Sequence, residues 1–324
     1  MTPLEKTIRE RIAAEGPMDV ATFMELAVSH YYATRDPFGA KGDFTTAPEV
    51  SQMFGELLGA WAVDVWMKLG RPKFQLIECG PGRGTLMMDA LRAAAKAPGF
   101  LEAAQIFLVE NSPLLTEKQK TLLKDYKIEW VENLNSPIIQ SSSEPVILLA
   151  NEFLDALPIA QKAGEEPRTI IVDRGRLKFD PPRGEITETS SVRENFVREV
   201  AKLLKARTGT ALFIDYGYEG PATGDTLQAV REHHYISALD FVGEVDLTAH
   251  VDFMPLKKAG MEEGMLILGP VAQGDFLRRL GIAERADALL QNAKDMKQRG
   301  EVAAAHARLT SSSQMGRLFK VMAF

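Results

Sequence analysis

The chain has 324 residues, a net charge of −6 at neutral pH, and 45% hydrophobic and 25% charged residues. This composition is ordinary for a globular protein with one large domain or two modest ones. The acidic balance, with no block of Lys or Arg, argues against a nucleic-acid partner, because phosphate binding needs a basic surface. A single cysteine, Cys79, excludes an internal disulfide and any zinc site built from several cysteines.

Residues 1–48 are predicted to form an N-terminal region of two helices and a covering loop. Apolar residues recur three and four apart over residues 3–15 and again over 20–30. The loop that follows is polar but carries several aromatic rings, so it either folds over a ligand or packs against the main domain. Asp43 and Thr45 in this loop are candidates to close over a substrate pocket.

The N-terminal sequence mixes acidic and basic residues and matches neither a signal peptide nor a transit peptide. No apolar stretch reaches the roughly 18 residues that a membrane-spanning helix needs. We therefore expect a bacterial cytoplasmic protein without membrane insertion.

Residues 49–324 are predicted to form the main domain. A long amphipathic helix over 49–69 is followed by strands and helices in alternation, which predicts a parallel sheet with helices on both faces. The strands are expected at 74–79, 105–110, 127–132, 146–150, 211–216 and 318–324. Short strands with turns predict a small antiparallel insertion at about 159–188. An additional lobe at about 219–306 is expected to hold a helix over 247–260, a strand over 264–268 and a helical region over 274–306.

A glycine-rich turn follows the first strand of the predicted sheet. Gly80, Gly82 and Gly84 stand between this strand and a predicted helix, where glycine lets the backbone approach a ligand. A dinucleotide-binding fingerprint would need its third glycine where Thr85 stands. The pattern that begins at Glu78, Glu-x-Gly-x-Gly-x-Gly, resembles the first motif of S-adenosylmethionine (SAM)-dependent methyltransferases. A loop that binds no cofactor is the alternative interpretation.

Polar residues end the next two strands. Ligands of open α/β sheets bind at the carboxyl ends of the strands. Glu110 ends the second strand, and a carboxylate there can accept hydrogen bonds from both hydroxyls of a ribose. Asn133 follows the third strand and could read the edge of an adenine. Together with the glycine turn, these residues predict a nucleotide site of the SAM type.

Carboxylates also follow the fourth and fifth strands. Glu152 and Asp155 lie among apolar residues, where unpaired carboxylates are costly, so they are candidates to bind a cationic acceptor. A carboxylate could hold the guanidinium of an arginine and align its nitrogen with the methyl group. An Asx-type turn or a helix cap formed by Asn151 and Asp155 is the structural alternative. Asp215 and Tyr216, at the end of the fifth strand, could line the acceptor pocket.

Other chemistries find little support. The histidines are not spaced as a metal-binding set, so no metal is expected. No Gly-x-Ser-x-Gly motif is present to start a Ser-His-Asp triad.

The sequence resembles the MidA-like family of SAM-dependent methyltransferases, which includes the mitochondrial assembly factor of respiratory complex I. The matching segments run in order along nearly the whole chain: Gly42–Glu49, Ser51–Glu56, Glu78–Thr85, Ala150–Pro158, Ile214–Tyr218, Asp246–Phe253, Gln273–Phe276 and Met315–Lys320. The resemblance implies a Rossmann-like class I α/β fold. Its sheet would have seven strands, the last antiparallel, with N-terminal helices and an inserted or appended lobe.

The resemblance also implies an activity, that of a protein arginine N-methyltransferase acting on a respiratory complex I subunit or its homologue. Under this hypothesis Glu78, Gly80, Gly82, Gly84, Glu110 and Asn133 bind SAM, and Glu152 and Asp155 orient the acceptor. The alternatives are a SAM-binding assembly factor with little or no catalysis, and a nicotinamide-dependent oxidoreductase, which the missing third dinucleotide glycine argues against. The identity of the substrate protein, the methylation symmetry and the oligomeric state are not encoded in any motif.

Overall fold

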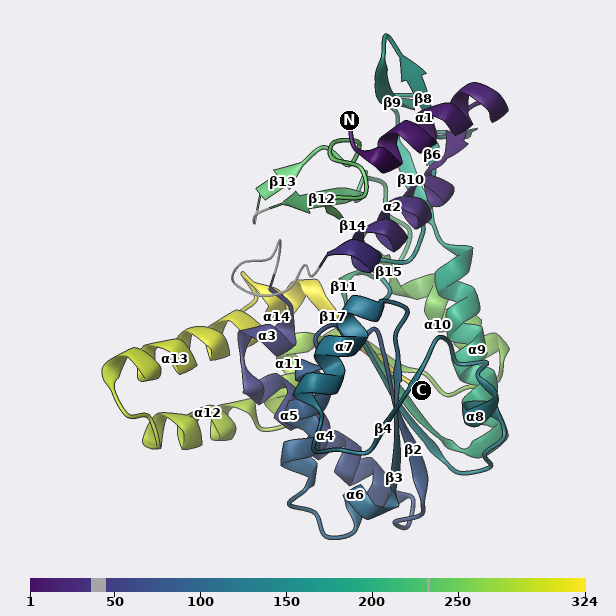
Figure 1. The fold of residues 1–324 in the computed structure, drawn as a ribbon. Coiled ribbons are helices and arrows are strands. Elements are labelled where there is room, and N and C mark those ends of the chain that lie inside the picture. The colour runs from purple at the N-terminus through teal and green to yellow at the C-terminus, as the bar shows by residue number, and fades with distance from the viewer. Residues whose placement is uncertain (36–44, 232–233) are drawn as a thin grey trace.

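The computed structural model of the chain describes residues 1–35, 45–231 and 234–324. Over these residues a central sheet of eight strands follows the order β16-β17-β11-β5-β2-β3-β4, with β15 paired to β11 (Figure 1). The bounds are β2 Phe74–Cys79, β3 Ala104–Val109, β4 Ile128–Val131, β5 Val146–Asn151, β11 Gly209–Tyr218, β15 Val251–Asp252, β16 Leu268–Ala272 and β17 Phe319–Ala323.

Strands β4, β3, β2, β5 and β11 are parallel to one another, whereas the last strand, β17, is antiparallel to its neighbours β11 and β16. Strand β2 is buried on both faces, as expected for a central strand of a parallel sheet. Seven of these strands form one continuous hydrogen-bonded order, and the final strand is antiparallel. This arrangement confirms the predicted Rossmann-like α/β class.

Helices cover both faces of the sheet (Figure 1). Leu76 of β2 packs with Trp66 and Leu91 from the helices on one face, and the adjacent Ile77 packs with Leu204 and Leu256 from the helices on the other. The helices of the first face are α3 Ala47–Val50, α4 Gln52–Lys68, α5 Thr85–Ala94, α6 Phe100–Ala103 and α7 Pro113–Leu122. Those of the second are α8 Pro137–Gln140, α9 Ser191–Arg207 and α10 Phe253–Glu262.

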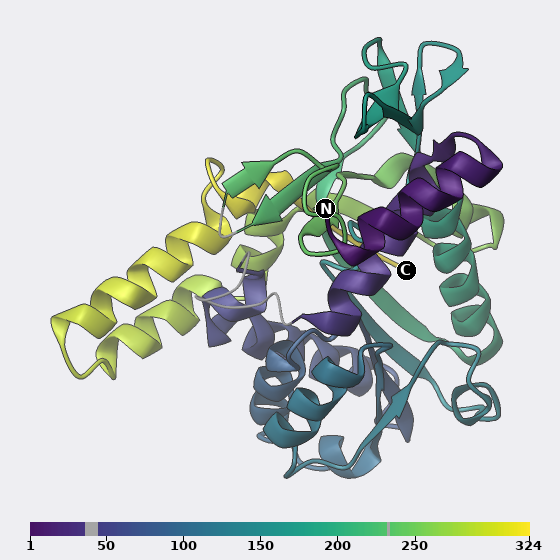
Figure 2. The ribbon, with the colours of Figure 1, turned by 45° about the horizontal axis from the view of Figure 1, so that its top comes forward.

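The N-terminal helices share a core with two later segments and form a separate lobe (Figure 2). Ile8 and Phe23 from the helices pack with Ile170 of the predicted insertion and with Leu247 of the segment after β11. The lobe elements are α1 Pro3–Glu15, β1 Met18–Asp19, α2 Val20–Thr34, β6 Ala160–Ala163, β7 Glu166–Pro167, β8 Thr169–Asp173, β9 Arg176–Asp180, β10 Ile186–Thr189, β12 Gln228–Arg231, β13 His234–Ile236 and β14 Asp246–Thr248.

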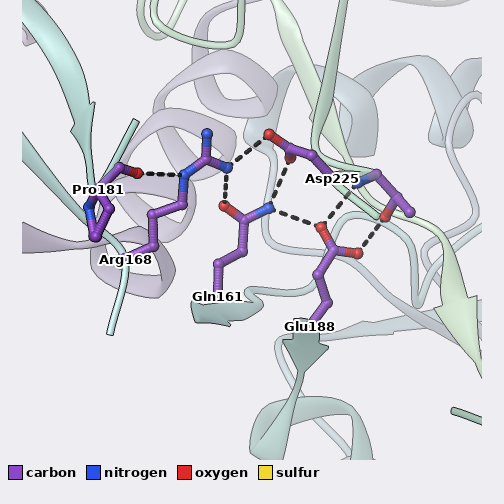
Figure 3. Close-up of polar contacts among 6 residues, drawn as sticks. Gln161, Arg168, Pro181, Glu188 and Asp225 are labelled. Atoms are coloured by element: carbon purple, nitrogen blue, oxygen red, sulfur yellow. Dashed lines mark hydrogen bonds and ion pairs between the residues drawn. The ribbon is translucent and has the colours of Figure 1, made fainter. Parts of the chain in front are cut away.

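A polar network fixes the insertion to the segment that follows β11 (Figure 3). Nη1 of buried Arg168 donates to Gln161 Oε1 at 2.9 Å and to Asp225 Oδ2 at 2.6 Å. Nε2 of Gln161 donates to Asp225 Oδ1 and to Glu188 Oε1. Because these groups bond one another, the lobe is connected by directional contacts as well as by its apolar core.

The remaining helices lie elsewhere, so the residues expected to form one lobe at 219–306 pack in two places. Helices α11 Gln273–Arg279, α12 Ile282–Gln291, α13 Met296–Thr310 and α14 Met315–Leu318 pack beside α4 and the β16 and β17 side of the sheet, and α12 and α13 extend outward as an arm (Figure 1). Gly281, with φ +89°, separates α11 from α12 within the helical region expected at about 274–306.

Three predicted boundaries were wrong. The helix expected from 247 starts at Phe253, because Asp252 caps it and the preceding residues pair with β12. The strand expected at 264–268 is β16, at Leu268–Ala272. The long helix expected over 49–69 is divided at Ser51, which accepts a hydrogen bond from the Met53 N–H and caps α4.

Candidate active site

The glycine-rich turn between β2 and α5 has a backbone geometry that favours glycine. Gly80, Gly82 and Gly84 have φ values of +67°, +54° and +85°. A Cβ atom on Gly80 would lie 2.7 Å from Cδ2 of Phe153, so a larger residue would collide with that ring. Gly84 is the N-cap of α5, and the turn therefore brings the N–H groups of a helix start to the edge of the sheet.

A cavity of about 660 Å³ opens at this edge. Its lining comes from α2, the glycine turn, the ends of β3 and β4, residues 152–158 and the first half of α9. Cavities of about 300–1,000 Å³ are typical of small-molecule sites. The carboxyl ends of the parallel strands and the N-terminal lobe thus enclose a space large enough for a nucleotide-sized ligand.

Glu110 lies on the wall of this cavity. Its Oε1 accepts from the Ser112 N–H at 2.8 Å, and its Oε2 accepts from Nε2 of Gln119 at 2.9 Å. The same Gln119 nitrogen donates to the Gly82 carbonyl at 2.7 Å. Burial raises the pKa of Glu110, and the hydrogen bonds oppose this shift. Each carboxylate oxygen has two lone pairs, so Glu110 retains the capacity to accept ribose hydroxyls.

Asn133 is exposed at the rim of the same cavity. Its Oδ1 accepts from the Asn135 N–H at 3.0 Å, which fixes the side-chain oxygen in an Asx-type turn. The amide NH₂ group is the part of this side chain left to donate to a ligand.

A small adjoining cavity of about 40 Å³ shares Gly80, Gly82 and Glu152 with the large one. Glu78 and Asn151 are buried on its wall, and Glu78 Oε2 and Asn151 Oδ1 accept no hydrogen bond from the described residues. Burial, followed by the charge of Glu110, raises the pKa of Glu78 to about 8. Two unsatisfied buried acceptors are costly without a donor, and an ammonium group, such as the one SAM carries, is a donor for oxygens of this kind.

Glu152 lies where the two cavities meet. Its φ of +48° is rare for a residue with a side chain. Its Oε1 accepts from the Ala47 N–H at 2.8 Å and from Nδ2 of Asn151 at 3.2 Å, and its own N–H donates to the Ile214 carbonyl at 2.8 Å. Burial raises the pKa of Glu152 to about 7.

Asp155, Asp215 and Tyr216 do not line either cavity. Asp215 is fully buried, and its Oδ2 accepts from the N–H groups of Leu154 and Asp155 at 2.9 and 3.1 Å. The Asp155 carboxylate hydrogen-bonds Tyr216, and burial raises the pKa of both aspartates. These side chains face inward because they hydrogen-bond one another and the backbone N–H groups beneath the loop that carries Glu152.

Two buried residues of this region were not predicted. Arg193 donates from Nη2 to the backbone oxygens of Asp155 and Ala249 at 3.1 and 3.0 Å, and from Nη1 to that of His250 at 2.8 Å. Gln119 joins Glu110 to the glycine turn, as described above. Both residues lie on amphipathic helices, where the sequence alone gives no signal that separates them from surface residues.

The covering loop is described only in part. The Thr45 carbonyl accepts from Nη2 of Arg308 at 3.5 Å, and Thr45 does not line the cavities, whereas Thr46 lines the small one. Asp43 lies outside the described residues. One wall of the large cavity was not predicted from sequence: Glu25, Ser29 and Tyr32 of α2 lie on it. Their spacing of four and three residues is the signal that could have identified this polar helical face.

The large cavity is acidic. Its described lining includes five glutamates, at positions 25, 110, 132, 152 and 199, and no Lys, Arg or His. SAM carries a sulfonium and an ammonium, so the charge of the cavity, the free acceptors of Glu78 and Asn151, and Glu110 all suit this cofactor.

Two further properties concern the described residues as a whole. Within residues 1–35, 45–231 and 234–324, every helix is too short or too polar to span a bilayer. The described side chains form no group of three or more His, Cys, Asp or Glu that could hold a metal ion.

Comparisons with known proteins agree with this geometry. The chain matches a family of S-adenosyl-L-methionine-dependent methyltransferases over residues 57–175 and 162–271. Protein arginine methyltransferase NDUFAF7, mitochondrial, of Bos taurus is 33% identical over 370 residues, a match that covers 100% of this chain and 83% of the relative. The homologous protein of Drosophila melanogaster is also 33% identical, with 99% and 84% covered.

A solved structure shares the fold. The crystal structure of a Burkholderia thailandensis protein bound to S-adenosyl-homocysteine has a TM-score of 0.84 and 25% identity, covering 99% of this chain and 91% of that one. The family match extends over most of the main domain, and the relatives match nearly end to end. The chain therefore belongs to the family of SAM-dependent methyltransferases that its sequence and fold match.

Proposed function

We propose that the protein transfers the methyl group of SAM to an arginine nitrogen of another protein. The observation that carries this proposal is the position of Glu152, a partly buried carboxylate between the small cavity and the large acidic one. A carboxylate holds the planar guanidinium fork with directional hydrogen bonds. The full-length relatives named as protein arginine methyltransferases support the same acceptor.

The residues divide into two groups in this proposal. Glu78, Asn151, Glu110, Asn133 and the glycine turn hold SAM, which supplies an electrophilic methyl group on sulfur. Glu152 binds the guanidinium and fixes the orientation of its nitrogen, which is the main contribution a binding carboxylate can make to a direct displacement. The nitrogen bonds the methyl carbon as the methyl–sulfur bond breaks, and S-adenosyl-homocysteine leaves. The nitrogen releases one proton to water, so the methylated guanidinium keeps a single positive charge.

Asp155, Asp215 and Tyr216 act as positioning residues beneath the loop. Asp215 holds the N–H groups of residues 154 and 155, and Glu152 keeps its left-handed φ next to them. The segment that begins at Thr45 contributes in the same way, because the Ala47 N–H donates to Glu152.

We further propose that the acceptor is a subunit of respiratory complex I or a bacterial homologue. The support is the resemblance along the chain to the family of the complex I assembly factor and the match to its mitochondrial members. A cytoplasmic location in a bacterium is part of this proposal.

Replacing Glu152 by Gln tests the role of the carboxylate. The amide keeps the size of the side chain but cannot accept two guanidinium N–H bonds, so methylarginine formation should fall by a factor of about 100 or more, while the Kd for SAM stays within about threefold. Methylation is measured by mass spectrometry of arginine peptides, and SAM affinity by calorimetry. Glu301→Gln on the exposed face of α13 is the matched control.

Three outcomes would contradict the proposal. Normal methylation by Glu152→Gln would show that the carboxylate does not hold the acceptor. SAM binding lost together with activity would place Glu152 among the cofactor ligands. If the wild-type protein binds SAM but methylates no arginine, the SAM-binding assembly factor is the better account.

A further inference from the structure

The part of the large cavity beyond the cofactor residues has two helical walls. Glu25, Ser29 and Tyr32 of α2 lie on one wall, and Val192, Phe196 and Glu199 of α9 lie on the other. Both sets are spaced four and three residues apart, so each forms a single helical face directed to the cavity. Glu25, Ser29, Val192 and Glu199 are exposed, so this part of the cavity opens to solvent.

The inner end of this groove is aromatic. The rings of Phe153 and Phe196 are 4.8 Å apart at an interplanar angle of 52°, and both line the cavity. Phe153 also packs against Gly80 of the cofactor turn and directly follows Glu152. An aromatic face next to a carboxylate suits a guanidinium, which stacks on rings and pairs with carboxylates at the same time.

The outer end is acidic and its charges are available. Glu25 and Glu199 are exposed and form no ion pair with any described residue, although many other surface carboxylates of the described chain do so. No Lys, Arg or His is among the described residues that line the cavity. Unpaired carboxylates at an entrance attract cationic groups and repel anionic ones.

From these observations we infer that the groove between α2 and α9 is the acceptor channel. It binds an extended protein segment whose target arginine passes Phe196 to reach Glu152 and whose neighbouring residues are basic. The inference rests on the proposed arginine methylation and adds the entrance, the wall residue Phe196 and the sequence preference of the substrate. Glu25 and Glu199 contact the flanking basic residues in this arrangement and take no part in the chemical step.

Peptide binding tests the channel separately from catalysis. Fluorescent peptides with one central arginine, flanked on both sides by Lys, Ala or Glu, are titrated into the protein with S-adenosyl-homocysteine present. We expect the Lys-flanked peptide to bind about tenfold or more tightly than the Glu-flanked one at low salt, with a smaller ratio at high salt. The same peptides are then incubated with SAM and analysed for methylarginine.

The double variant Glu25→Gln/Glu199→Gln should bring the Lys-to-Glu ratio of Kd values close to one. Because both carboxylates are exposed, the Kd for SAM should change by no more than about threefold. Glu284→Gln/Asp287→Asn, which removes two exposed carboxylates from α12 on the distant arm, is the matched control and should keep the ratio. Equal binding of all three peptides, or a ratio that survives in the double variant, would overturn the channel. Charge-dependent binding without any methylarginine would instead overturn the proposed function.

Phe196→Leu tests the inner wall. Leucine keeps an apolar side chain against Phe213 but removes the ring face, so the KM for the Lys-flanked peptide should rise about three- to tenfold. The Kd for SAM and the melting temperature serve as controls for the cofactor site and the fold. An unchanged KM in a folded variant would remove Phe196 from the channel.

Discussion

Glu152 has a backbone conformation that is rare for residues with a side chain, φ +48°, at the junction of the two cavities. Such a conformation is unfavourable by about 1–3 kcal/mol unless its surroundings stabilise it. Here the Glu152 N–H donates to the Ile214 carbonyl, and Asp215 accepts from the N–H groups of Leu154 and Asp155 in the same loop. These hydrogen bonds offset the unfavourable φ of Glu152 and hold its carboxylate at the cavity, where the proposed acceptor meets the cofactor.

The raised pKa of Glu152, about 7, predicts a pH-dependent rate. Only the carboxylate form attracts a guanidinium, which stays protonated throughout this range. The kcat/KM for an arginine peptide at saturating SAM should therefore rise with pH to a plateau. The midpoint of this rise should lie at or below pH 7, because the positive charge of bound SAM lowers the pKa of Glu152 from its raised value.

A pH series from 5 to 9 measures this profile. Below the midpoint the rate should fall about tenfold per pH unit, and Glu152→Gln should show a low rate without this slope. A flat wild-type profile over the series would contradict a titrating carboxylate at the acceptor.

At the scale of elements, the close packing of α4 against α5 holds the helix that starts at the glycine turn. A Cβ atom on Gly59 of α4 would lie 2.3 Å from the Ala90 carbonyl oxygen and 2.7 Å from its Cα. Gly55, one helical turn earlier, meets Asp89 and Leu86 in the same way. The two helices approach so closely because these positions have no side chain.

Gly59→Ala should destabilise the protein by about 2–3 kcal/mol, because the added methyl group forces two backbones apart. Gly300→Ala in α13 is the control, since a Cβ atom there meets nothing within 4 Å. Alanine is the better helix former, so this control should be neutral or stabilise by up to about 1 kcal/mol. Thermal and urea unfolding measure both, and equal effects of the two substitutions would contradict the packing argument.

Local patterns predicted most elements of the sheet, because strand and helix periodicity and capping residues act over a few positions. They also predicted the glycine turn and Glu110, which follow directly from the chain order of a βαβ unit. The roles of Asp155 and Asp215 could not be predicted in this way. Asp155 follows β5 and Asp215 lies near the end of β11. Asp215 accepts from the N–H groups of residues 154 and 155, and the Asp155 carboxylate hydrogen-bonds Tyr216, which depends on how β5 and β11 lie side by side.

At the scale of the whole molecule, the site depends on segments that are far apart in sequence. The carboxyl ends of β2, β3, β4 and β5 provide the floor of the cavity, and α2 of the N-terminal lobe provides a wall. The lobe is itself assembled from residues before β2, between β5 and α9, and after β11. The spacing within α2 can indicate a polar helical face, but it does not show that this face meets the carboxyl ends of the strands. The α2 wall was therefore absent from the predicted site.

The most direct measurement is a calorimetric titration of the purified protein with SAM, S-adenosyl-homocysteine and NADH, alongside Gly82→Val. Gly82 lines both cavities with φ +54°, where a branched side chain is strained and would enter the cofactor space. We expect micromolar binding of the two adenosyl ligands, no NADH binding, and a loss of affinity of at least about 100-fold in a folded Gly82→Val variant. Unchanged affinity in that variant, or binding of NADH in place of the adenosyl ligands, would contradict the assignment of this edge of the sheet to SAM.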